Sequence, residues 1–159
     1  MNKKNVKKPV FTSLALLICI QLFACCNKSS AITSSPDNVL NTDSMKLKIA
    51  IGANTFTATV NNNSTATAFK TRLPLAINMT ELNGNEKYFD FPDNLPANAS
   101  NPGTIQAGDL MLYGSNTLVL FYKSFSTSYN YTRLARIDNP SGLAAALGSG
   151  NATVKFELE

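Results

Sequence analysis

The sequence contains no histidine and no tryptophan, and its three cysteines are Cys19, Cys25 and Cys26. The absence of histidine excludes catalytic triads, general bases and metal sites that depend on an imidazole. Because no cysteine follows residue 26, the rest of the chain has no disulfide, no thiolate metal site and no cysteine nucleophile. Phosphate-binding loops and Ser-x-x-Lys patterns are also absent, so we predict no metal site and no cofactor.

Most of the chain also lacks a net charge. The formal charge is +4 at pH 7, from 14 basic and 10 acidic residues, but Lys3, Lys4, Lys7 and Lys8 supply four of the basic ones. Beyond these lysines, ten basic residues balance ten acidic ones. A nucleic-acid-binding domain needs a basic patch on its folded surface. The charge distribution therefore predicts no nucleic-acid partner.

The N-terminus has the pattern of a bacterial secretory signal. The lysines are followed by an apolar stretch over residues 10–23, which is too short for a comfortable membrane span. Its end, Leu22-Phe23-Ala24-Cys25, resembles a lipobox, so residues 1–24 are predicted as a lipoprotein signal peptide. Acylation of Cys25 would then attach the protein to a lipid bilayer.

The predicted anchor is followed by a polar segment. Residues 25–44 are rich in Ser, Thr and Asn, and this composition is typical of a flexible tether. The second residue of the mature chain would be Cys26 and not the Asp that signals inner-membrane retention in enterobacteria. We therefore expect the protein in the cell envelope, on the outer membrane and facing the periplasm.

Residues 45–159 consist of short runs with strand-like alternation, separated by Gly, Pro and Asn. Strands are predicted over residues 46–51, 55–60, 75–79, 87–89, 110–113, 117–123, 131–138 and 152–158. Short helices are predicted over residues 65–73, which Pro74 ends, and 142–147, which Gly148 ends. Residues 118–122 are apolar throughout, so both faces of that strand should be covered. We predict a mostly β domain, a closed antiparallel barrel with two short helices, because closure removes exposed edges.

Five phrases occur in order along residues 46–158: FKTRLPL at 69–75, LNGNEKY at 82–88, PGTIQAGDLMLY at 102–113, FSTSY at 125–129, and Gly142-Leu143. Together they resemble the cyclophilin-like domain family of bacterial, Bacteroidetes-type proteins, here carried on a lipoprotein. The resemblance implies the cyclophilin barrel. Some family members occur beside or fused to flavodoxin-like domains, which makes such a protein a candidate partner.

The resemblance does not carry over a catalytic set. True cyclophilins are prolyl isomerases whose pocket uses an Arg, a Gln, aromatic residues and a His or Trp. Residues 105–109, Ile-Gln-Ala-Gly-Asp, resemble their Ile-Gln-Gly-Gly-Asp phrase. The chain has no His or Trp, and the Phe-x-Arg phrase that carries their catalytic Arg has no clear match. We therefore assign no catalytic residue.

Five residues are candidates for ligand binding. Arg72 could offer its fork of donors to a carbonyl or carboxylate, or could simply be a cation at a helix C-terminus. Gln106 could hydrogen-bond an amide, and Arg133 could line a pocket or lie on a solvated strand face. Tyr88 and Tyr129 lie in stretches that look like loops, which makes them the better pocket candidates among the aromatic residues.

The neighbouring polar residues are given structural roles. Asp109 is expected to satisfy its own turn beside Gly108. The carboxylates of Glu81, Glu86, Asp90 and Asp93 match no calcium loop and are expected to be solvated loop charges.

Besides a role as an accessory to a redox partner, for which the chain has no cofactor motif, two functions remain open at this point. The first is a binding module that holds a small molecule or a peptide near Arg72, Tyr88, Gln106 and Arg133. The second is a divergent peptidyl-prolyl cis-trans isomerase in which Arg72 or Gln106 weakens the amide resonance.

Overall fold

The computed structural model describes residues 44–159. The predicted signal peptide, the predicted lipidation site Cys25 and nearly all of the predicted tether lie outside the described residues. Within residues 44–159, no helix has the length and apolarity needed to cross a membrane.

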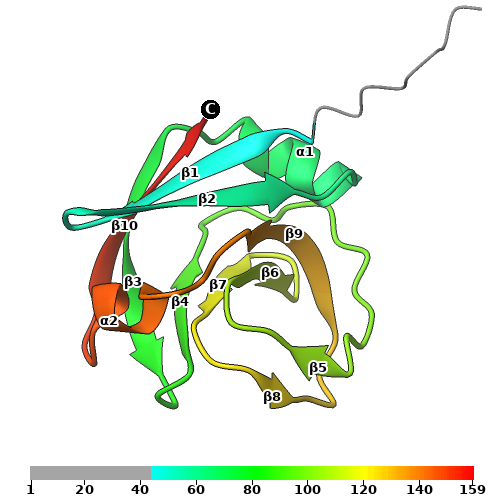
Figure 1. Cartoon of the computed structure of the whole chain (residues 1–159). Coiled ribbons are helices and arrows are strands. Elements are labelled where there is room, and N and C mark those ends of the chain that lie inside the picture. The colour runs from blue at the N-terminus through cyan, green and yellow to red at the C-terminus, as the bar shows by residue number, and fades with distance from the viewer. Residues whose placement is uncertain (1–43) are drawn as a thin grey trace, which may run out of the picture. The chain divides into compact units, whose positions relative to one another are not determined.

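Eight strands form a closed antiparallel barrel in the order β1-β10-β3-β4-β7-β6-β9-β2 (Figure 1). The barrel strands are β1 Lys46–Ile51, β2 Asn54–Val60, β3 Leu75–Leu82, β4 Glu86–Asp90, β6 Asp109–Tyr113, β7 Thr117–Phe121, β9 Tyr131–Ile137 and β10 Ala152–Leu158. The short strands β5 Thr104–Ile105 and β8 Phe125–Ser126 pair with each other as a separate sheet. The two helices are α1 Ser64–Lys70 and α2 Leu143–Leu147. The closed antiparallel barrel with two short helices is therefore confirmed.

The first helix ends three residues earlier than expected. Its N-terminus is capped by Asn63, whose side chain accepts a hydrogen bond from the Ala66 N–H at 2.8 Å. After Lys70 the chain tightens into a turn, in which the Arg72 N–H donates to the Phe69 carbonyl at 3.0 Å. Bonds of this shorter span commonly close the last turn of a helix.

The apolar side chains form two clusters, one on each face of the sheet around β6 and β7. The interior cluster includes Leu110, Leu112, Leu118 and Leu120 together with residues from α1 and α2. The second cluster contains the alternate residues of these strands and covers the outer face: Ile105, Met111, Val119, Phe121 and Tyr131, with Tyr88 and Phe125 packed against it. Both faces of β7 are therefore covered, as the apolar run over residues 118–122 predicts.

The segment over residues 124–130, for which the sequence predicts no strand, contains β8. Thr104 pairs with Ser126 and Ile105 with Phe125. The Phe125 ring lies 5.8 Å from the Phe121 ring, centroid to centroid. The β5–β8 sheet thus contributes Ile105 and Phe125 to the outer cluster.

Candidate functional site

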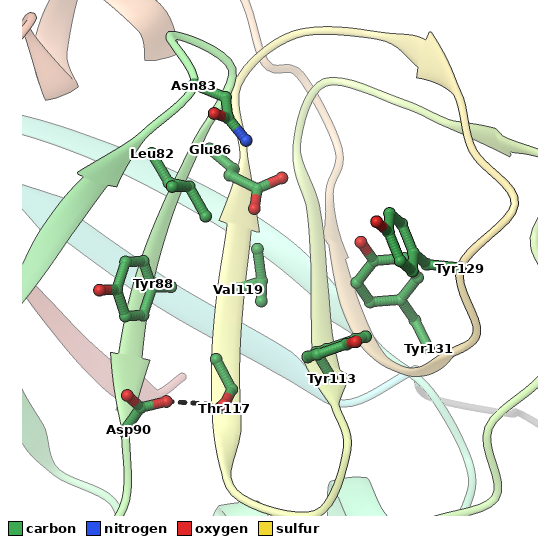
Figure 2. A pocket seen from close by; sticks show the side chains of 10 residues that line it. All are labelled: Leu82, Asn83, Glu86, Tyr88, Asp90, Tyr113, Thr117, Val119, Tyr129 and Tyr131. Atoms are coloured by element: carbon green, nitrogen blue, oxygen red, sulfur yellow. Dashed lines mark hydrogen bonds between the residues drawn. The ribbon is translucent and has the colours of Figure 1, made fainter.

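A pocket of about 430 Å³ opens on the outer face of the barrel, over β4, β6 and β7 (Figure 2). Its walls come from the β3–β4 turn, from the outward side chains of these strands, and from the segment that leads into β9. It is lined by Leu82, Asn83, Glu86, Tyr88, Asp90, Tyr113, Thr117, Val119, Tyr129 and Tyr131. Ligand pockets in proteins commonly have volumes of about 300–1,000 Å³, so this pocket has room for a small organic ligand.

Strand alternation and register bring the floor of the pocket together. Side chains two residues apart on a strand point to the same face, so Glu86, Tyr88 and Asp90 lie together and the residues between them face the barrel interior. The pairing of β4 with β7 sets Tyr88 opposite Val119 and Asp90 opposite Thr117. The Thr117 hydroxyl donates to Asp90 Oδ1 at 2.6 Å. The floor is therefore a continuous surface of two hydrogen-bonded strands.

Three tyrosines form an aromatic wall. Tyr113 on β6 pairs with Tyr131 on β9, and their ring centroids are 5.5 Å apart. The Tyr129 ring meets Tyr113 edge to face at 6.1 Å. Tyr131 is buried, whereas Tyr113 is 45% and Tyr129 61% exposed. The wall therefore presents large aromatic surfaces to solvent at the pocket mouth.

Glu86 is the half-buried charge of the pocket. Burial, with a smaller contribution from the negative charge of Glu81, raises the pKa of its carboxyl above the usual value. Burial, and next the charge of Glu86, also raises the pKa of the Tyr131 hydroxyl. These two groups therefore share one poorly solvated region.

A buried charge network lies on the opposite face of β4. The Lys87 side chain is fully buried, and its Nζ donates to Glu81 Oε2, to the Gly148 carbonyl at 2.9 Å and to the Gly150 carbonyl at 2.5 Å. The Tyr122 hydroxyl lies 2.8 Å from Glu81 Oε1 and donates to this carboxylate. The network connects β3 and β4 to the segment between α2 and β10.

The network shifts the pKa values of its members in opposite directions. Burial opposes ionisation of Glu81, but hydrogen bonds from Lys87, Tyr122 and the Gly84 N–H, with the charge of Lys87, outweigh it and lower its pKa. Burial, followed by the hydrogen bond to Glu81, raises the pKa of Tyr122 to about 12. Glu81 is thus held as a carboxylate beside a protonated Tyr122.

The structure brings only two of the five predicted ligand-binding residues to the pocket. Tyr88 and Tyr129 line it, from β4 and from the segment before β9. Arg72, Gln106 and Arg133 are not among the residues that line it. As a ligand-binding set, the five residues stay a prediction.

Arg72 contacts the loop that follows β4. Its Nη2 donates to the Asp93 carbonyl at 3.3 Å, and its guanidinium lies 4.5 Å from the centroid of the Phe91 ring. Both contacts join the end of α1 to residues 91–93. Arg72 therefore has a structural role at this place.

Asp109 connects the other two predicted residues. Its Oδ2 accepts a hydrogen bond from the Gln106 N–H at 2.9 Å, which is the turn role expected of it. Its Oδ1 is buried without a hydrogen bond and lies 3.7 Å from Arg133 Nη1 and 3.8 Å from Arg136 Nε. A register shift between β6 and β9 skips Leu134, so that both arginines reach the same carboxylate.

The carboxylates in and near the pocket were expected to lie on loops. Glu86 and Asp90 lie on β4, and Glu81 lies on β3, so none of the three is a loop charge. The alternation Glu86-Lys87-Tyr88-Phe89-Asp90 is the signal that could have placed Glu86 and Asp90 beside Tyr88. The register that aligns β4, β7, β6 and β9 cannot be predicted in this way, because a single sequence does not show which residues of two strands lie opposite each other.

Among residues 44–159, no cluster of three or more Asp or Glu side chains could hold a metal ion. The pocket instead offers two carboxylates, phenolic hydroxyls and aromatic faces. The comparisons with known proteins agree with the architecture: a family model described as the cyclophilin-like family matches residues 49–157. A search of the curated proteins finds no match.

Proposed function

The chain belongs to the cyclophilin-like family, and from this premise we propose that it is a membrane-anchored binding module. The module holds a small molecule or a peptide in the pocket over β4, β6 and β7, and no catalytic residue is assigned to it.

One observation carries the proposal: four of the five tyrosines of the chain line this pocket. Two of them, Tyr113 and Tyr129, are about half exposed, and the exposed Leu82 lies on the other side of β7 (Figure 2). Contiguous exposed apolar and aromatic surface around a concave site commonly marks a binding site. Tyrosine suits this role because it offers a large rigid ring and a polar hydroxyl.

Prolyl isomerisation, the other function that the resemblance implies, receives less support from the pocket. That reaction needs a donor that weakens the resonance of the substrate amide. Arg72 and Gln106, the predicted donors, do not line the pocket, and no Arg or Lys lines it; the donors present are the Asn83 amide and the hydroxyls of Thr117 and of the tyrosines. A binding role requires only the aromatic and polar surface that is present.

The proposal also includes a membrane anchor at Cys25. Acylation of Cys25 would attach the chain to the outer membrane, with the barrel in the periplasm. A flavodoxin-like protein remains a candidate partner, on the strength of the family resemblance alone.

Native mass spectrometry of the full chain, extracted from its own membrane in a non-ionic detergent, tests the binding role. We expect an added mass that is retained on the folded protein and lost on denaturation. Tyr129→Ala removes one wall of the pocket and should lower the occupied fraction several-fold. Leu158→Ala, at an exposed apolar residue on β10, is the matched control and should leave it unchanged. Equal occupancy in both variants would contradict binding at this pocket.

A further inference from the structure

The pocket lining contains carboxyl groups and no basic side chain. Glu86 and Asp90 are the only carboxyl-bearing residues among its ten lining residues, which include no Lys, Arg or His. We propose that its ligand is an organic cation, an ammonium or guanidinium group carried on an apolar stem. This inference rests on the proposed binding function and specifies the chemistry of the ligand.

Glu86 is the residue that recognises the cation. Its carboxylate is directed into the pocket (Figure 2) and makes no hydrogen bond or ion pair with another residue of the described chain. The other carboxylates nearby have partners: Glu81 binds Lys87 and Tyr122, and Asp90 accepts from Thr117. A partly buried charge without a partner is unfavourable. A ligand that brings the opposite charge would supply the missing partner.

The aromatic wall favours the same chemistry. The faces of Tyr113, Tyr129 and Tyr131 carry the negative part of the ring quadrupole, which attracts cations. Their edge-to-face and tilted contacts leave the rings at different orientations around the pocket. A cation that pairs with Glu86 can therefore also lie against a ring face.

The remaining surface suits an apolar stem. Val119 and Leu82 contribute aliphatic surface to the lining, and Tyr88 packs against the outer apolar cluster. A neutral ligand would bury this surface but bring no opposite charge to Glu86. An anionic ligand would in addition meet the repulsion of two carboxylates.

Three probes of nearly equal shape and different charge test the inference: cyclohexylmethylamine, cyclohexylmethanol and cyclohexanecarboxylate. Because the chain has no tryptophan and four of its five tyrosines line the pocket, tyrosine fluorescence reports binding directly. The probes are titrated into the full chain in a non-ionic detergent. We expect the amine to bind most tightly and the carboxylate most weakly.

Glu86→Gln should weaken binding of the amine about tenfold and leave binding of the alcohol unchanged, as expected for loss of one charge-assisted contact. Glu157→Gln is the matched control, because Glu157 lies on β10, outside the pocket lining, in an exposed pair with Lys48. This variant should bind all three probes as the native chain does.

Two peptides separate the sources of the cation. If acetyl-Gly-Lys-Gly-amide binds more tightly than cyclohexylmethylamine, and acetyl-Gly-Gln-Gly-amide does not, the cation is a side chain of a peptide. If the free amine binds more tightly, the ligand is a small organic amine. Equal binding of the three cyclohexyl probes, or an unchanged amine affinity in Glu86→Gln, would overturn the inference that the ligand is a cation. Neither result would contradict the proposed binding function. No binding by any probe would count against the binding function as well.

Discussion

Lys87 shows how much a single charged residue can depend on its surroundings. A buried ammonium group is unfavourable unless its protons are hydrogen-bonded and its charge is paired. Lys87 meets both conditions, because its three donors reach one carboxylate and two backbone carbonyls. Removing one partner of such a buried pair commonly destabilises a protein by about 3–5 kcal/mol. The network therefore joins β4 to the segment that leads into β10.

Tyr122 gives this network a measurable dependence on pH. The pKa of Tyr122 is raised from 10.0 in the reference state to about 12 in the folded chain. Between these two pH values the unfolded chain has lost the proton that the folded chain keeps, so the free energy of unfolding falls as the pH rises. Below pH 10 the contribution of Tyr122 to the free energy of unfolding is fully present. We expect the thermal midpoint of the native chain to fall steeply between pH 10 and pH 12.

Tyr122→Phe removes the hydroxyl and should make this alkaline decline shallower, although its midpoint at neutral pH should be lower because Glu81 loses a donor. Tyr129→Phe, at the most exposed tyrosine, should decline as the native chain does. Identical alkaline profiles for the native chain and Tyr122→Phe would show that Tyr122 does not carry this dependence.

At the scale of elements, the turn between β5 and β6 is set by Gly108. Its φ is +90°, a conformation that favours glycine, and a Cβ built there would lie 3.0 Å from Ile137 Cβ and 3.2 Å from Pro140 Cβ. The Gly108 N–H donates to the Phe121 carbonyl, and its own carbonyl accepts from the Ile137 N–H. The glycine therefore allows β6, β7 and the end of β9 to approach closely.

Gly108→Ala should consequently destabilise the chain more than Gly114→Ala does. Gly114 also has a positive φ, +59°, but a Cβ there would meet open space. The second variant thus isolates the backbone strain, about 1–2 kcal/mol. Overpacking should add about 1–3 kcal/mol in the first. Denaturant unfolding of both variants gives the difference, and equal losses would mean that the contacts with Ile137 and Pro140 relax freely.

How well the sequence predicts each element depends on where its signal lies. The bounds of β1 and β10 match the predicted ranges 46–51 and 152–158, because strict alternation over a half-buried strand is a local signal. The strands β5 and β8, two residues each, have no alternation to detect and exist through their mutual pairing. The predicted helix over residues 65–73 extends three residues beyond the observed end at Lys70. Pro74 sets the last position at which the helix could end, but the helix ends before it.

The candidate site was less predictable than the strands, because its residues are brought together by cross-strand pairing and not by a local pattern. Tyr88 and Tyr129 were selected as aromatic residues near loops, but Tyr113 and Tyr131 reach the pocket through the pairing of β6 with β9. Arg72 and Arg133 were selected for their chemistry, which does not say what they contact. The register between neighbouring strands determines which residues line the pocket. A single sequence does not contain this register.

At the scale of the whole molecule, the proposed position of the barrel in the cell rests on Cys25, which lies outside the described residues. The Leu22-Phe23-Ala24-Cys25 pattern predicts acylation of Cys25, and Cys26 beside it is the matched control. In cells fed an alkyne-labelled fatty acid, we expect Cys26→Ala to be labelled as the native chain is and Cys25→Ala to be unlabelled. Label retained in Cys25→Ala would overturn this assignment of the anchor.

The two-sided burial of β7 has a consequence for how this protein can diversify. Leu118 and Leu120 face the interior cluster, whereas Thr117 and Val119 face the pocket. Alternate positions of this strand therefore belong to two different surfaces, the barrel interior and the pocket. If the pocket binds the proposed ligand, a substitution at position 117 changes the ligand preference without touching the interior cluster, whereas Val119 is also buried in the outer apolar cluster. In a lineage of such proteins, ligand preference can diverge faster than architecture.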